Sequence, residues 1–269
     1  MPDFVCVLRE PEFSPGKVEA DAAILVTVAG LLRREQYVVD VLDPRSRHWP
    51  QLPRRTVVLS MAQGEEALAR LHDWESQGIR VINSVAAVRN CHRLRAVELL
   101  RHAGIAAPAA VVVPTDAAAL PSWVDDASGV WVKRGDVHAM VAADVQFVAG
   151  RHGARRALRE LRSRGISTAV VQRHVRGRTV KFYAVGDQFF FIATAGNGGA
   201  APWERRLASL ARRAGGAFGL EVFGGDCIVE PNGECQLIDL NDWPSYAACR
   251  QNAAEAIAAY ARAEKAKVA

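Results

Sequence analysis

The sequence predicts an α/β amino-terminal lobe followed by an α+β region. In the first 84 residues, short β-rich segments alternate with helical segments, which is typical of a parallel sheet. From residue 109 onward strand patterns become frequent and helical patterns rare, which favours antiparallel sheets. We therefore expect an α/β lobe at residues 1–84 and an α+β region in the rest of the chain.

The elements of the first lobe follow from apolar periodicity and turn residues. Residues 18–35 read as an amphipathic helix, and the Pro-containing segment 43–53 reads as a loop. A single helix at 85–102, stopped by Gly104, should lead out of the lobe. The remaining elements are expected as strands at 4–8, 37–42, 56–59 and 80–83 and a helix at 64–76.

Strands dominate the rest of the chain. Gly186-Asp187 predicts a tight hairpin, and residues 247–265 form an Ala-rich helix whose terminal basic residues complement the helix dipole. The other strands are expected at 109–113, 130–134, 141–148, 169–174, 179–185 and 188–194, with helices at 151–164 and 203–217.

Composition indicates a globular enzyme. The chain has 269 residues, half of them hydrophobic and 23% charged, which excludes a mainly disordered protein. Its longest apolar stretch, residues 22–32, is too short to span a bilayer, and no secretory signal is visible. Five cysteines without C-x-x-C spacing favour reduced thiols. We therefore expect a cytoplasmic protein that does not bind membranes.

The charge balance favours an anionic ligand or substrate. The net charge is +5 and the isoelectric point is about 9.1. The densest basic run, residues 151–164, is either a polyphosphate or nucleic-acid contact or a solvated helix face with Ala157, Leu158 and Leu161 packed inward. No aromatic residues interleave with it for base stacking. We expect a small anionic substrate rather than nucleic acid, and a homodimer as the default assembly.

The segment 225–241 contains the most informative pattern in the chain. Asn232-Gly233 predicts a two-residue hairpin turn, which would place Asp226 directly opposite Asp239 with Cβ atoms roughly 5 Å apart. Because side chains alternate along a strand, Asn241 should share the face of Asp239. Two carboxylates and an amide oxygen form a hard ligand set that suits Mg²⁺, with further ligands from substrate phosphates.

An ordinary edge hairpin with solvated acids is the alternative interpretation of this segment. Opposed like charges destabilise a hairpin unless a positive charge lies between them. The predicted register also places Ile228 and Leu237 on the carboxylate face, which argues against a fully solvated face.

Further segments accompany the hairpin in a fixed order. Asn83-Ser84 follows a strand and precedes the basic segment 89–95, and Val130 to Lys133 is an apolar strand ending in a lysine. A strand then runs through Gln172 into a short connector, and residues 177–186 begin the next sheet. Together with Asp226, Asp239 and Asn241, this order and spacing resembles the ATP-grasp superfamily over nearly the whole chain. The resemblance implies a three-lobed ATP-grasp architecture, an α/β lobe followed by two α+β lobes, at residues 1–84, 85–172 and 173–269. ATP would bind between the central and carboxy-terminal lobes.

The resemblance assigns three cations to the phosphates of ATP. Lys133 is similar to the strand lysine that reaches the adenine and the α-phosphate. Arg93 stands where the family usually has a lysine, and its guanidinium keeps the charge and can bind phosphate with two nitrogens. Lys181 stands where many members place a basic residue facing the γ-phosphate. Arg93 and Lys181 are accordingly the expected catalytic cations.

The adenine site is implied by the connector after the central lobe. The backbone of this hinge would read the adenine edge, with apolar walls such as Val132 and Ile238 on either side of the ring. The hinge residues are Gln172, Arg173, His174 and Val175. The side chain of His174 has no partner at ligand spacing, and its simplest role is structural.

The resemblance also implies that Asp226, Asp239 and Asn241 bind Mg²⁺, or Mn²⁺ in its place. Asp239 replaces the commoner glutamate of the family, which shortens its reach by one methylene. The resulting Asp-x-Asn pattern resembles that of inositol polyphosphate kinases in the same superfamily. The metal assignment therefore leaves both ligase and kinase chemistry open.

Two loops depart from the family pattern. The phosphate-covering loop 134–139 carries one glycine, and its His138 either touches phosphate or substrate or is an exposed loop residue. Thr194-Ala195 stands where amino-acid ligases often carry an arginine that holds the acyl phosphate. The glycine-containing segment 195–199 is expected to lie over the substrate.

The predicted function is ATP- and Mg²⁺-dependent phosphoryl transfer. The first hypothesis is a carboxylate–amine ligase, similar to glutamate-ligase-like ATP-grasp enzymes, that forms an acyl phosphate and releases ADP. The alternative is a kinase that phosphorylates a hydroxyl of a polyanionic small molecule such as an inositol phosphate. A nucleotide-binding regulator is a third class, although an inactive site need not keep Asp226, Asp239 and Asn241 in register.

Overall fold

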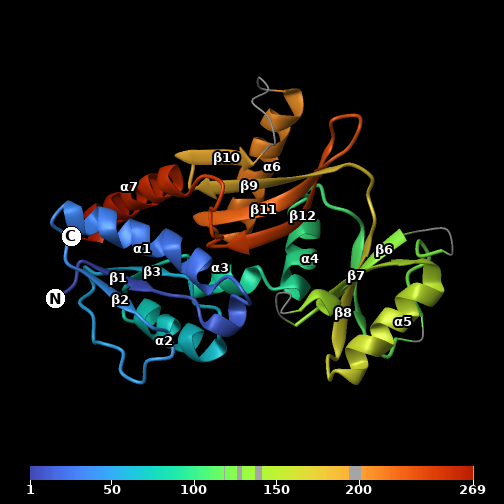
Figure 1. The fold of residues 1–269 in the computed structure, drawn as a ribbon, viewed down its shortest axis with the longest axis horizontal. Helices are drawn as coiled ribbons and strands as arrows, with labels where there is room; N and C mark the ends of the chain where they lie inside the picture. The colour runs from blue at the N-terminus through green and yellow to red at the C-terminus, as the bar shows by residue number, and fades with distance from the viewer. Residues whose placement is uncertain (118, 126–128, 137–140, 194–200, 269) are drawn as a thin grey trace.

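The computed structural model describes residues 1–117, 119–125, 129–136, 141–193 and 201–268. Within these residues the strands form three four-stranded sheets, one for each predicted lobe (Figure 1). Both termini lie at the same end of the molecule. Among the described helices, none is both long enough and apolar enough to cross a bilayer.

The first sheet is parallel, as the alternation of strands and helices predicts. Residues of β1 alternate between two cores: Phe4 and Cys6 pack with helix α1, whereas Val5 and Val7 pack with α2. Burial on both faces explains why this strand is continuously apolar. The strand order is β2-β1-β3-β4, with β1 (Phe4–Val7), β2 (Val39–Leu42), β3 (Val57–Ser60), β4 (Arg80–Ile82), α1 (Val18–Arg34) and α2 (Glu65–Ser76).

The expected single helix at 85–102 is wrong, because the structure has two helices there. Helix α3 (Val85–Asn90) ends at buried Cys91, and His92 adopts an extended conformation that begins α4 (Arg93–His102). The Ser84 side chain caps α3 by accepting from the Ala87 N–H. The break lets α4 turn toward helix α6 and places Arg93 in its first turn.

The central sheet is antiparallel and is covered by a helix on one face only. Helix α5 (Gly150–Ser163) buries Ala157, Leu158 and Leu161 against it, as the solvated-face interpretation of the basic run predicts. The opposite face is turned toward the rest of the molecule (Figure 1). The order is β5-β8-β6-β7, with β5 (Ala110–Pro114), β6 (Gly129–Arg134), β7 (Val145–Ala149) and β8 (Thr168–Arg173).

The strand expected at 141–148 begins later than predicted. A 3-10 turn, Ala142–Asp144, occupies its first residues, because the buried Asp144 carboxylate accepts from the Val141 N–H at 3.1 Å. Arg134 and Arg164 both contact that carboxylate. Its hydrogen bonds and charge partners are therefore satisfied within the turn rather than in a strand.

The third sheet is antiparallel and lies between two helices. Helix α6 (Pro202–Phe218) packs on one face, and α7 (Arg250–Val268) packs on the other and against α1. Tyr183, Trp243 and Tyr246 share one core with α1 and α7. The order is β10-β9-β11-β12, with β9 (Arg178–Val185), β10 (Phe189–Ala193), β11 (Val222–Val229) and β12 (Cys235–Asp242).

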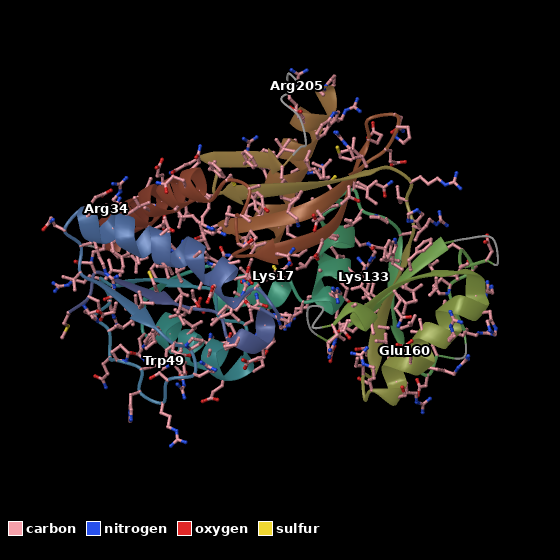
Figure 2. All side chains as sticks on the ribbon, viewed as in Figure 1. Lys17, Arg34, Trp49, Lys133, Glu160 and Arg205 are labelled. Atoms are coloured by element: carbon pink, nitrogen blue, oxygen red, sulfur yellow. The ribbon has the colours of Figure 1, made fainter. Side chains whose placement is uncertain are left out.

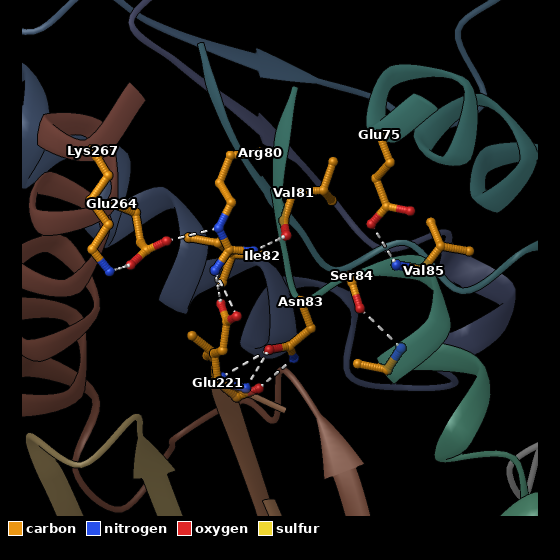
Figure 3. Close-up of polar contacts among 12 residues, drawn as sticks. Glu75, Arg80, Val81, Ile82, Asn83, Ser84, Val85, Glu221, Glu264 and Lys267 are labelled. Atoms are coloured by element: carbon orange, nitrogen blue, oxygen red, sulfur yellow. Dashed lines mark hydrogen bonds and ion pairs between the residues drawn. The ribbon is translucent and has the colours of Figure 1, made fainter. Parts of the chain in front are cut away.

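Hydrogen bonds and ion pairs also connect the first lobe to the third (Figure 3). The Arg80 guanidinium donates to Glu221 at 2.6 Å and to Glu264 of α7 at 2.8 Å. The Asn83 side chain accepts from the Glu221 and Val222 N–H groups and donates to the Val222 carbonyl. The first and third lobes thus share both a core and a polar interface.

Candidate functional site

The turn of the metal hairpin differs from the predicted one. The Glu230 N–H donates to the Glu234 carbonyl, and the Gly233 N–H donates to the Glu230 carbonyl, so three residues close the loop instead of two. Gly233 has a positive φ of 81°. Val229 consequently pairs with Cys235, one residue out of the predicted register.

A β-bulge restores the predicted pairing at the carboxylates. The ladder shifts between Asp226 and Cys227, so that Cys227 faces Leu237 whereas Asp226 faces Asp239. Ile238 is therefore the extra residue on β12. Without the bulge Asp226 would face Ile238, and the predicted opposition of Asp226 and Asp239 is confirmed only because the bulge cancels the longer turn.

The bulge also decides which side chains face the cleft. Ile238 and its neighbour Asp239 both line it, although regular alternation would send them to opposite faces. Leu237 is fully buried in the core under α6, so its predicted place on the carboxylate face is wrong. Ile228 lines the cleft as expected.

The carboxylates of Asp226 and Asp239 both have polar partners within the protein. Lys181 Nζ lies 2.8 Å from Asp226 Oδ1, and the Asn241 side-chain amide donates to Asp239 Oδ2 at 3.3 Å. Within the described residues, no group of three or more His, Cys, Asp or Glu side chains could hold a metal ion. Two carboxylates and an amide oxygen fit Mg²⁺ when phosphate oxygens complete the coordination.

A cleft of about 290 Å³ separates the central sheet from the third sheet. Each sheet contributes a charged residue from its facing side: Lys133 comes from β6 and Asp226 from β11. The cleft is lined by Arg93, Pro108, Trp131, Lys133, Val145, Gln172, Arg173, His174, Val175, Gly177, Thr179, Asp226, Ile228, Ile238 and Asp239.

Comparisons with known proteins give different results for the sequence and for the structure of this chain. No family model matches the chain, and no curated protein matches it. The D-alanine–D-alanine ligase of Bacillus anthracis matches with a TM-score of 0.74 and 10% identity, over 99% of both chains. The D-alanyl-alanine synthetase A of Vibrio cholerae matches with a TM-score of 0.73 and 12% identity, over 99% of this chain and 100% of that one.

A third solved structure that is similar to this chain is an ATP-grasp ligase. The ATP-grasp ligase PsnB, solved with a minimal precursor, Mg and ADP, matches with a TM-score of 0.67 and 16% identity over 98% of both chains. This chain has the ATP-grasp fold. The predicted fold class, an α/β lobe followed by α+β lobes, is thereby confirmed.

Within the ATP-grasp fold of this chain, two of the three predicted cations, Lys133 and Arg93, line the cleft, whereas Lys181 lies beside it in an ion pair with Asp226. Lys133 Nζ donates to the Ile238 carbonyl at 3.4 Å across the two sheets, and Figure 2 labels Lys133 on the side of the central lobe that faces the third. Burial lowers the pKa of Lys133, although nearby Asp239 opposes that shift. Burial likewise lowers the pKa of Arg93, which donates to the Arg134 carbonyl. Both cations are therefore partly desolvated, a state in which they interact strongly with anions.

The four residues of the predicted hinge, Gln172 to Val175, all line the cleft. Gln172 and Arg173 end β8, and His174 and Val175 continue the chain toward β9. The Arg173 N–H donates to the Ala109 carbonyl, and the His174 N–H donates to the Gly129 carbonyl. These bonds fix the hinge against both neighbouring strands.

Val132, which was predicted as an adenine wall, does not line the cleft. Val132 is buried in the core under α5, because alternation along β6 sends it away from the face of Lys133. Trp131 lies on the cleft instead, and its indole N–H donates to His174 Nδ1 at 3.2 Å. The same alternation, counted from Lys133, was the signal that could have found Trp131.

A second cavity of about 250 Å³ adjoins the carboxylates on the other side. Arg93 and Asp239 line both cavities, so the two cavities are neighbours at these residues. The first lobe supplies Arg9, Phe13 and Gln63, which the sequence had not indicated. Asn241, Asp242 and Pro244 line the rest of the second cavity.

Asp242 is a buried carboxylate at this second cavity. Its Oδ1 accepts from Gln63 Nε2 at 2.7 Å, and Arg9 donates to the backbone carbonyls of Asp242 and Trp243. Its Oδ2 is buried without a hydrogen-bond partner among the described residues. Burial raises the pKa of Asp242 to about 6, although Arg9 opposes the shift.

Two predicted features lie outside the described residues. They are His138 of the phosphate-covering loop and the segment 194–199 that contains the predicted substrate loop. The roles assigned to the described cations, hinge and metal ligands remain predictions.

Proposed function

We propose that this protein is an ATP- and Mg²⁺-dependent ligase that joins a carboxylate to an amine and releases ADP. One observation carries the proposal: Lys133, Arg93, Asp226 and Asp239 line a single cleft that the hinge also borders. The solved ligases that share the fold support the same reaction class.

In this proposal the base end of ATP lies against the hinge and the phosphates lie toward the carboxylates. Ile238 and Trp131 provide apolar surfaces from the two facing sheets. The Arg173 and His174 N–H groups are already used within the protein, which leaves the Val175 N–H as the hinge donor toward adenine. Lys133 and Arg93 then neutralise phosphate oxygens.

Asp226, Asp239 and Asn241 would hold Mg²⁺, or Mn²⁺ in its place. The opposed carboxylates and the amide supply hard oxygen ligands, and phosphate oxygens supply others. When bound, the metal supplies positive charge that stabilises the β- and γ-phosphate oxygens during transfer.

The chemistry begins at an acceptor carboxylate in the second cavity. A carboxylate oxygen attacks the γ-phosphorus, the bond to the β-γ bridging oxygen breaks, and ADP leaves with that electron pair. Arg93, which borders both cavities, is placed to stabilise the transferring group. An amine then attacks the acyl carbon, inorganic phosphate leaves, and the amine loses a proton to form the amide.

The second cavity favours the ligase over the kinase alternative. Its described ionisable side chains are two arginines and two aspartates: Arg9, Arg93, Asp239 and Asp242. Arg9 already donates to three backbone carbonyls of its own chain. A polyanion with several phosphates would need more positive charge than two arginines supply beside two aspartates. A small carboxylate requires only one cation.

Hydroxylamine trapping tests the proposal. We expect the purified protein, incubated with ATP, Mg²⁺, hydroxylamine and a panel of amino acids and dipeptides, to form ADP and a hydroxamate, because an acyl phosphate is electrophilic at carbon. Asp239→Asn should keep the fold and lose this reaction, since an amide cannot replace the charge that holds Mg²⁺. Stable transfer of the γ-phosphate to a hydroxyl, without hydroxamate, would contradict the ligase and favour the kinase.

A further inference from the structure

Lys181 pairs directly with one of the predicted metal ligands. Its Nζ lies 2.8 Å from Asp226 Oδ1 and 3.0 Å from Oδ2, so one ammonium engages both carboxylate oxygens. The contact is built into the sheet, because Lys181 of β9 and Asp226 of β11 are directly paired residues on adjacent strands. The Lys181 side chain is 48% exposed, so it is free to reorient through solvent.

A divalent cation at the predicted site needs the same oxygens. Asp226 faces Asp239 on its other side, which makes it the carboxylate shared between the Lys181 ammonium and the metal hairpin. Metal bound there would repel the ammonium at a separation of a few ångströms. Lys181 and the metal therefore compete for Asp226.

We propose that Lys181 is an exchangeable counter-ion of the metal site: it neutralises Asp226 until a metal–nucleotide complex enters, and then moves to the terminal phosphate. This inference rests on the proposed function of the cleft. The phosphates supply both metal ligands and a new anionic partner for the ammonium. The exchange keeps the charges compensated before and after binding.

The exchange predicts that metal and nucleotide bind cooperatively. Metal alone must displace Lys181 without offering it another anion, whereas metal with nucleotide provides one. By linkage, the metal then raises nucleotide affinity by the same factor as the nucleotide raises metal affinity. Replacing Lys181 by a neutral residue should reduce this coupling by improving the binding of metal alone.

Mn²⁺ binding without nucleotide tests the competition, and the free-ion signal in electron paramagnetic resonance measures it. We expect Lys181→Met to bind Mn²⁺ roughly three- to tenfold more tightly than the wild type. Arg178→Met is the matched control, because Arg178 lies on the same strand but stacks over the Trp203 ring. Its Mn²⁺ affinity should equal that of the wild type.

Two further variants make the outcome decisive. Lys181→Arg should bind Mn²⁺ as weakly as the wild type, and Asp226→Asn in the Lys181→Met protein should abolish the gain. Equal Mn²⁺ affinity of Lys181→Met and the wild type would overturn the inference. Thermal protection by Mg²⁺ and ATP, measured in parallel, separates the two proposals: its absence in the wild type contradicts the nucleotide site, whereas the Mn²⁺ comparison tests Lys181 alone.

Discussion

At the scale of single residues, the cleft combines desolvated cations with closely spaced carboxylates. Lys133 and Arg93 are held in a partly buried environment that lowers their pKa values, and Asp239 opposes both shifts. Bound phosphate would act in the same direction as Asp239. Such residues contribute to ligand binding more than to the stability of the free protein, and this distinction is testable.

Lys133→Ala should remove most of the thermal protection by Mg²⁺ and ATP. Protection follows mass action and reaches about 2.7 kcal/mol when ligand is at 100 times its dissociation constant. Thermal unfolding with and without Mg²⁺ and ATP measures it. Lys17→Ala, at the exposed start of α1, is the control and should be protected like the wild type. Full protection of Lys133→Ala would exclude its assigned place in the cleft.

The pKa of Asp242 predicts a pH dependence of stability. Burial raises this pKa to about 6 from the ordinary value of 3.8, so the folded state binds its proton more tightly than the unfolded state does. The contribution to stability is thus fully present below about pH 4 and is lost as the pH rises through about 6.

Asp242→Asn should therefore stabilise the protein at neutral and higher pH. The amide oxygen can still accept from Gln63, while the cost of a buried charge disappears. We expect a gain on the order of 1–3 kcal/mol at about pH 8 that vanishes below about pH 4. Chemical denaturation at several pH values measures it. A gain that does not depend on pH would show that charge burial is not the cause.

At the scale of elements, the metal hairpin shows how two local irregularities compensate. The three-residue turn displaces the register by one position, and the bulge at Ile238 displaces it back. Bulges also re-aim side chains near functional sites. Here the bulge directs Ile238 and Asp239 into the same cleft.

Gly233→Ala should destabilise the hairpin without blocking the cleft. Gly233 has φ of 81°, where an L-residue is strained, and the added Cβ would have only the Arg206 guanidinium, at 3.5 Å, as a near neighbour. We expect a loss of about 1–2 kcal/mol, seen as a lower midpoint of thermal unfolding. Gly216→Ala is the control: it lies in α6 with open space around it and should gain about 0.5–1 kcal/mol. Equal effects of the two substitutions would contradict the backbone argument.

At the scale of the whole molecule, the first and third lobes behave as one packed body. Helix α7 fills the space between α1 and the third sheet, and Arg80 joins Glu221 to Glu264 across the same interface. The central sheet has its own core under α5. The cleft therefore lies between two separately packed bodies.

Arg80→Met should destabilise the first and third lobes together. The substitution leaves the partly exposed Glu221 carboxylate and the buried Glu264 carboxylate without their shared guanidinium, at a cost of about 1–2 kcal/mol after allowance for solvent screening. Calorimetry measures whether both lobes unfold in one transition. Separate unfolding of the first lobe in this variant would show that the shared core does not couple the unfolding of the first and third lobes.

The sequence predicted most elements because their signals are local. The alternation of strands and helices predicted the parallel first sheet, and the frequent strand patterns predicted the antiparallel sheets that follow it. It missed the break at Cys91-His92 and the turn before Val145, because those depend on buried contacts between segments. Val132 lies in the core and Trp131 on the cleft, because side chains alternate along β6 and Trp131 shares the face of Lys133.

By itself the sequence determined that Asp226 and Asp239 lie on the two strands of one hairpin and that a lysine-bearing strand and a connector precede it, since a hairpin and the order of elements along a chain are short-range properties. Only the tertiary structure decided that Ile238 bulges, that Lys181 pairs with Asp226, and that Gln63 meets Asp242 across 179 positions of sequence. The physical reason is packing: a side chain has a fixed partner only when the sheets and helices around it have closed.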